Sequence, residues 1–199
     1  LPRPSACAQS EDTCAEAAVK FLSGRLVVTP GFAALLSASA YFGSLRLTGA
    51  FMLAATIHEL GHLLVLHFMG TAPERLTLSA CGAELTVRSG LSFRRELLLC
   101  LAGPAANLTG MGLSALGRWP LLLGASLLLC AFNLLPLRPL DGGNALFAFL
   151  SLVCAPDRAE RLTALFSRGA ALAVLMLGGV LMWENGRPWL FFMGLWLTG

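Results

Sequence analysis

The chain has 199 residues, of which 56% are hydrophobic and 13% are charged, and its formal net charge is +3. Soluble domains carry roughly 25% charged residues, so this composition excludes an ordinary soluble domain and indicates an integral membrane protein. We therefore expect the lipid bilayer as a partner and no nucleic acid, while the oligomeric state stays open.

The N-terminal residues 1–25 mix prolines with acidic and basic side chains, and we expect a short cytosolic extension there. A secretory signal places its charged start directly before an apolar core, and this segment does not have that pattern. The remaining residues, 26–199, are expected to form one membrane-embedded domain.

Uncharged apolar runs mark the expected membrane spans, because roughly 20 apolar residues cross a bilayer core. The runs predict an all-α polytopic membrane protein with about six transmembrane helices, at 26–45, 47–73, 97–117, 119–137, 169–183 and 188–199. The last two runs are short, so the fifth helix is expected to begin earlier, near Leu165, and the sixth to cross only part of the membrane.

The basic residues predict the orientation, since they concentrate on the cytoplasmic side of membrane proteins. With the N-terminus inside, eleven of the 14 basic residues lie on that side, and only Arg46, Arg118 and Arg187 lie outside. This orientation places the C-terminal halves of the second and fourth spans, where the chemically reactive residues occur, on the cytoplasmic side of the cell membrane.

His58, Glu59 and His62 form a His-Glu-x-x-His pattern within the second span. Positions i and i+4 share one face of a helix, so both imidazoles can bind one zinc ion while Glu59 acts as general base on a water molecule. A chance match would leave a costly carboxylate at bilayer depth unexplained. His67 lies five residues past His62, off this face, and is expected at the membrane interface.

A catalytic zinc keeps three protein ligands and one open position, so a third ligand is expected elsewhere. After the fourth span, Pro136 and Pro139 interrupt helix hydrogen bonding before the lone Asp141. Such breaks at membrane depth are tolerated where they line a cavity, which favours Asp141 as the ligand over an ordinary surface turn. The six cysteines form no Cys-x-x-Cys pair and are expected to pack as small apolar residues.

Residues 75–88 alternate apolar and polar side chains around Cys81 and Gly82. This period of two predicts a short cytosolic β-hairpin between the second and third spans. An extended peptide could add as a strand to such an edge; an ordinary loop hairpin is the equal alternative.

Three segments, His58 to His62, residues 102–107 and residues 133–143, together resemble the site-2 protease family of intramembrane zinc metalloproteases and occur in that family's order. The resemblance covers residues 26–199 and is greatest to the branch of the sporulation stage IV protease, which cleaves a membrane-tethered pro-sigma factor. It implies one Zn²⁺ bound by His58, His62 and Asp141, with Glu59 activating water.

The same resemblance implies that Asn107, Asn133 and Pro136 bind the substrate. Helix packing with Gly103 is the alternative for Asn107, because small residues and amides also join membrane helices.

The sequence thus predicts an intramembrane zinc metalloendopeptidase that cuts a membrane-tethered protein in or next to its transmembrane segment. Two other functions stay open, a catalytically inactive scaffold of the same family and a metal transporter. A transporter would place further ligands along a path through the membrane, whereas this chain has only three histidines.

Overall fold

The computed structural model describes residues 26–28, 44–71, 73–79, 82–87, 90–138 and 140–185. They fall into two compact units, one formed by Leu1–Ser44 with Thr71–Ser89 and the other by Leu45–Gly70 with Gly90–Gly199. The extension expected at residues 1–25, most of the first expected span and the whole sixth span lie outside the described residues.

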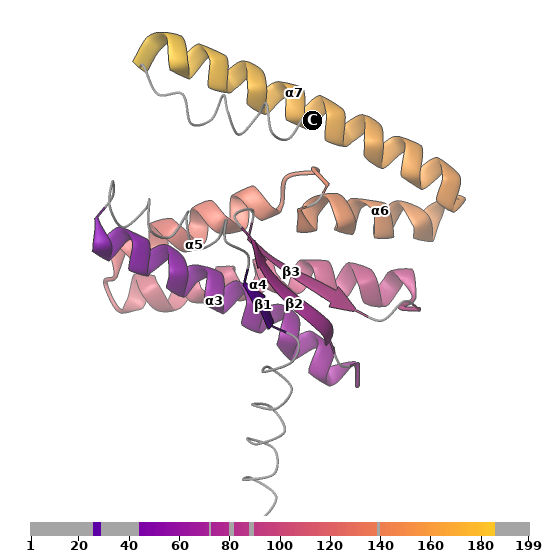
Figure 1. Ribbon diagram of the computed structural model, residues 1–199, viewed down its shortest axis with the longest axis horizontal. Helices are drawn as coiled ribbons and strands as arrows, with labels where there is room; N and C mark the ends of the chain where they lie inside the picture. Colours follow the sequence, from indigo (N-terminus) through magenta and orange to yellow (C-terminus); the bar gives the residue numbers. More distant parts are fainter. Residues whose placement is uncertain are drawn as a thin grey trace, which may run out of the picture. The chain divides into compact units, whose positions relative to one another are not determined.

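The first unit contains a three-stranded sheet in the order β1-β2-β3 (Figure 1). Its strands are β1 (Leu26–Val28), β2 (Pro73–Ser79) and β3 (Gly82–Val87). β1 pairs with β2 in parallel, and β2 pairs with β3 antiparallel, with Thr77 opposite Glu84. A register shift between Pro73 and Arg75 is consistent with the missing N–H of the proline.

The second unit consists of helices: α3 (Leu45–Phe68), α4 (Phe93–Leu116), α5 (Pro120–Asn133), α6 (Asp141–Val153) and α7 (Pro156–Asn185) (Figure 1). α4 packs against α3, α5 and α6, while α3 also contacts α5, and α6 contacts α7. The thiol of Cys130 on α5 donates a hydrogen bond to the carbonyl of Pro104 on α4, at 3.6 Å. α4 is therefore the central helix of this unit.

Many of the buried side chains of the helical unit are small, and many large apolar side chains face outward. Ala54, Ala125 and Ala148 are buried, whereas Leu60 and Leu64 are more than half exposed. A soluble protein would bury such leucines, but lipid solvates them, and small residues let membrane helices approach closely.

Three described helices are long and apolar enough to span a membrane, Leu45–Phe68, Phe93–Leu116 and Pro156–Val180. The described residues also form two shorter apolar helices. The chain is a membrane protein.

The predicted fold class is wrong as stated. The described part of the chain contains three candidate spans rather than the six expected. The residues expected to form a two-stranded hairpin belong to a sheet that also includes a third strand, β1, which the prediction placed in a membrane helix. Leu26–Val28 falls in the first expected span because a short apolar run cannot be assigned to helix or strand by periodicity alone.

Two further boundaries differ from the prediction for local reasons. α5 ends at Asn133 rather than at residue 137, since Pro136 cannot continue a helix. The region between Arg138 and Arg168, expected on the cytoplasmic side as a connection, contains all of α6 and the first turns of α7. α7 extends back to Pro156, further than the expected start near Leu165.

Candidate metal centre

Two histidines of α3 form one side of the centre. His58 and His62 lie one helical turn apart, and both are buried, at 5% and 7% exposure. Their Nε2 atoms are 3.2 Å apart. The four-residue spacing therefore directs both imidazoles to the same point, as the helical pattern predicted.

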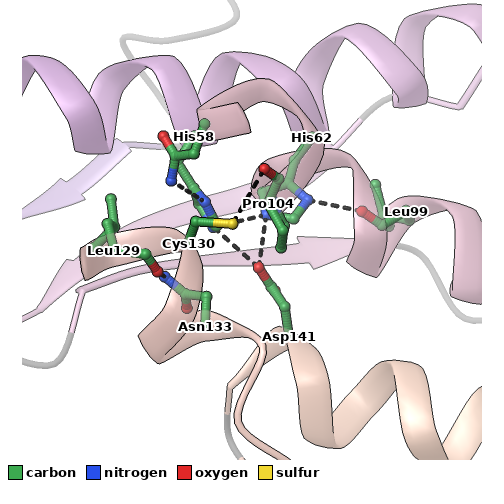
Figure 2. Close-up of polar contacts among 9 residues, drawn as sticks. His58, His62, Leu99, Pro104, Leu129, Cys130, Asn133 and Asp141 are labelled. Atoms are coloured by element: carbon green, nitrogen blue, oxygen red, sulfur yellow. Dashed lines mark hydrogen bonds and ion pairs between the residues drawn. The ribbon is translucent and has the colours of Figure 1, made fainter. Parts of the chain in front are cut away.

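Asp141 completes the cluster from helix α6. It is the first residue of α6, and its Oδ2 lies 2.9 Å from His58 Nε2 and 3.2 Å from His62 Nε2. Figure 2 shows the carboxylate directed at the two rings. A Cβ on Gly142 would overlap the carbonyls of Leu134 and Leu135, so only glycine lets the preceding turn fold this closely onto the start of α6.

The three side chains fit a metal ion. Their ligand atoms all lie within 4.8 Å of one another, and two ligands of a tetrahedral zinc ion at about 2.0–2.1 Å from the metal are roughly 3.3 Å apart. Despite the short distances, Asp141 Oδ2 is buried and accepts no hydrogen bond within the described part of the chain. A cation among these atoms would satisfy that oxygen.

Helix α4 contacts both imidazoles. The carbonyl of Leu99 is 2.9 Å from His62 Nδ1, and the amide of Asn107 is 3.1 Å from His58 Nδ1. A Cβ added to Gly103 would overlap both rings. These three residues repeat every four positions, so one face of α4 supports the whole centre.

Glu59 follows His58 on α3 and is half-buried. It is close enough to interact electrostatically with His58, His62 and Asp141. Its carboxylate does not belong to the group of three ligand atoms.

The turn that precedes Asp141, which includes residues 134–138, is held against α7 by hydrogen bonds. Ser167 Oγ donates to the carbonyl of Pro136 at 3.0 Å and accepts the backbone N–H of Arg138 at 3.2 Å. The guanidinium of Arg138 lies 4.5 Å from the ring centroid of Phe147 and 3.3 Å from Glu160. Leu137 and Leu140 pack with Ala171 in a buried cluster. Hydrogen bonds between Ser167 and the backbone of the turn, together with apolar contacts to Ala171, thus hold the turn against α7.

The residues expected at the site differ in where the structure places them. Asn107 contacts His58 and is fully buried. Asn133 donates to the carbonyl of Leu129 on its own helix at 3.1 Å, as Figure 2 shows, and the carbonyl of Pro136 is engaged by Ser167. Gly103 and Ser167 were not expected to support the site. The spacing of 99, 103 and 107 could have indicated α4, but nothing in the sequence marks Ser167.

Comparisons with known proteins place the chain among zinc metalloproteases. It is 30% identical over 137 residues to the zinc metalloprotease MJ0392 of Methanocaldococcus jannaschii, covering 63% of this chain and 40% of that protein. It is 32% identical over 177 residues to Rip3 of Mycobacterium tuberculosis, which is named as a zinc metalloprotease, covering 73% of this chain and 43% of that one. The chain thus spans less than half the length of both relatives. No model of a known protein family matches it.

The fold comparison points the same way. The structure of a site-2 protease from Methanocaldococcus jannaschii matches with a TM-score of 0.64 and 25% sequence identity, over 87% of each chain. The match covers most of both chains, so the two proteins share an overall fold. The chain belongs to the site-2 protease family of zinc metalloproteases.

Proposed function

We propose that the chain is an intramembrane zinc metalloendopeptidase that hydrolyses a peptide bond in or next to the transmembrane segment of a membrane-tethered protein. The observation that carries this proposal is the convergence of His58, His62 and Asp141 within 4.8 Å, with Glu59 beside them. A structural zinc site is closed by four protein ligands, whereas three ligands leave a position for a reactant.

His58, His62 and Asp141 hold the metal in this proposal, and each has a distinct support. α3 sets the spacing of the two imidazoles, and the turn fastened to Ser167 sets the position of Asp141. Zinc bound there supplies Lewis-acid chemistry, making water a stronger nucleophile and polarising a carbonyl.

Glu59 moves the proton. It takes a proton from the attacking water and returns it to the amine that leaves when the peptide bond breaks. Its half-buried position next to the ligands suits this exchange, because it keeps the carboxylate near the reacting atoms while leaving part of it accessible. Water reaches Glu59 from the cytoplasmic side, because the distribution of basic residues favours an orientation with the site on that side.

Asn133 and Pro136 form the substrate side of the proposed site. Both belong to the end of α5 and the turn before Asp141, so a peptide bound along this turn would pass the metal ligands. A membrane-tethered pro-sigma factor is the substrate implied by the sequence resemblance, and the same chemistry would also cut an anti-sigma factor or a signal-peptide remnant.

The test uses the purified chain reconstituted in lipid vesicles with a membrane-tethered reporter protein. Wild type is compared with Glu59→Gln, and zinc per chain is measured for both. We expect one zinc in each protein and cleavage only by wild type, because glutamine occupies the same space but cannot accept a proton.

Asp157→Asn is the matched control, since Asp157 is an exposed acid in the first turn of α7. It should cleave like wild type. Cleavage by Glu59→Gln at the wild-type rate would remove Glu59 as the base. Zinc binding without cleavage by wild type would instead favour an inactive scaffold.

A further inference from the structure

Helix α4 determines which nitrogen of His62 is free to bind a metal. His62 Nδ1 lies 2.9 Å from the carbonyl oxygen of Leu99. A carbonyl only accepts hydrogen bonds, so Nδ1 carries the hydrogen of the neutral ring. His62 Nε2 is then left with its lone pair, and that atom faces Asp141 and His58.

His58 needs the same arrangement if it is to bind the metal through Nε2. Its Nδ1 then carries the hydrogen and requires an acceptor, since a buried N–H without one is costly. Asn107 is the side chain that faces this nitrogen, at 3.1 Å, and it is 0% exposed. A fully buried amide held against a ligand ring is better placed to orient that ring than to bind a substrate.

The amide of Asn107 can present the required acceptor. Its Nδ2 is the atom assigned next to His58, and its Oδ1 has no hydrogen-bond partner within the described residues. The oxygen and nitrogen of an amide exchange places on a half-turn of the side chain, and either orientation leaves one amide atom unpaired. No described hydrogen bond to Oδ1 therefore opposes the half-turn.

We propose that Asn107 is a positioning residue whose Oδ1 accepts the Nδ1–H of His58 and so holds His58 Nε2 towards the metal. This proposal rests on the proposed function, because it concerns the same centre. Leu99 and Asn107 then each accept the Nδ1–H of one imidazole from the same face of α4. This role replaces the substrate contact that the sequence predicted for Asn107. Metal-binding histidines usually donate their second N–H in this way.

The experiment measures zinc affinity by competition with a chromophoric chelator in the detergent-purified full chain. Asn107→Leu keeps the approximate volume but removes the acceptor, and we expect affinity to fall about 10- to 100-fold. Asn107→Asp keeps an acceptor and should bind zinc within a few-fold of wild type. Co²⁺ loaded in place of zinc gives a second readout, because its visible absorption reports the ligand geometry.

Ser114→Ala is the matched control, since Ser114 is another buried polar residue of α4 and donates to the carbonyl of Gly110 rather than to a ligand. Its zinc affinity should equal that of wild type. Wild-type affinity in Asn107→Leu, or an equal loss in the Leu and Asp variants, would overturn the acceptor role. Absence of zinc from wild type would overturn the proposed function as well, whereas lack of cleavage alone would leave the affinity comparison intact.

Discussion

Substituting Gly103 by alanine tests the close contact between α4 and the metal ligands. A Cβ on Gly103 would lie within 2.6 Å of ring atoms of both His58 and His62, and ordinary contacts begin near 3.4 Å. The three nearest ring atoms lie 2.4, 2.5 and 2.6 Å from that Cβ, so the added methyl group has to push the rings away by about 0.8 to 1.0 Å, the difference from 3.4 Å. Metal sites tolerate deviations of about 0.2 Å in ligand distance.

The expected loss follows from that comparison. A displacement several times larger than the tolerance should weaken zinc binding by about 100-fold, the upper end of what changes around a ligand cost, or roughly 2.8 kcal/mol. Helix propensity works in the opposite direction, since alanine in place of glycine favours a helix by about 1 kcal/mol. The variant should therefore fold yet bind zinc poorly.

The assay is chelator competition for zinc in Gly103→Ala and Gly112→Ala. Gly112 lies on the same helix, and a Cβ there would meet nothing within 4 Å, so its variant should bind zinc like wild type. Equal affinity in both variants would refute the close contact between Gly103 and the imidazoles. A loss in both would mean that any alanine in α4 disturbs the chain.

Two further substitutions probe the turn before α6. Asp141→Asn removes the charged ligand. Changes to residues that only support the ligands cost about 10- to 100-fold in metal affinity, and this variant should lose more than that. Chelator competition measures the loss, and unchanged affinity would exclude Asp141 as a ligand. Ser167→Ala removes two hydrogen bonds to the turn, worth about 1 kcal/mol each, so thermal unfolding in detergent should begin at a lower temperature and zinc should bind more weakly. An unchanged melting curve would mean that the packing of Leu137 and Leu140 holds the turn alone.

The convergence of His58 and His62 could be predicted because the information is local. His58 and His62 are one turn apart on any helix, so their spacing places both imidazoles on one face. Asp141 was found by a different route, as the lone acid after two helix-interrupting prolines. Its approach to within 2.9 Å of His58 depends on a turn that no local pattern describes.

The parts that were not predicted depend on contacts between distant segments. Strand β1 pairs with residues of β2 that lie fifty positions later in the chain. Its three apolar residues fit the start of a membrane helix equally well. α6 has only 13 residues, too few to be recognised as a span. Ser167 supports the turn through hydrogen bonds to backbone groups of residues about thirty positions away, and a serine in an apolar helix carries no signal of that role.

The most direct test of the central claim is zinc stoichiometry together with X-ray absorption at the zinc edge, measured on the purified full chain. We expect one zinc per chain with only nitrogen and oxygen ligands at about 2.0–2.1 Å, supplied by His58, His62 and Asp141. The buried thiols of Cys100 and Cys130 are the alternative ligands nearby on α4 and α5. A zinc–sulfur distance of about 2.3 Å, or no zinc at all, would contradict the assigned centre.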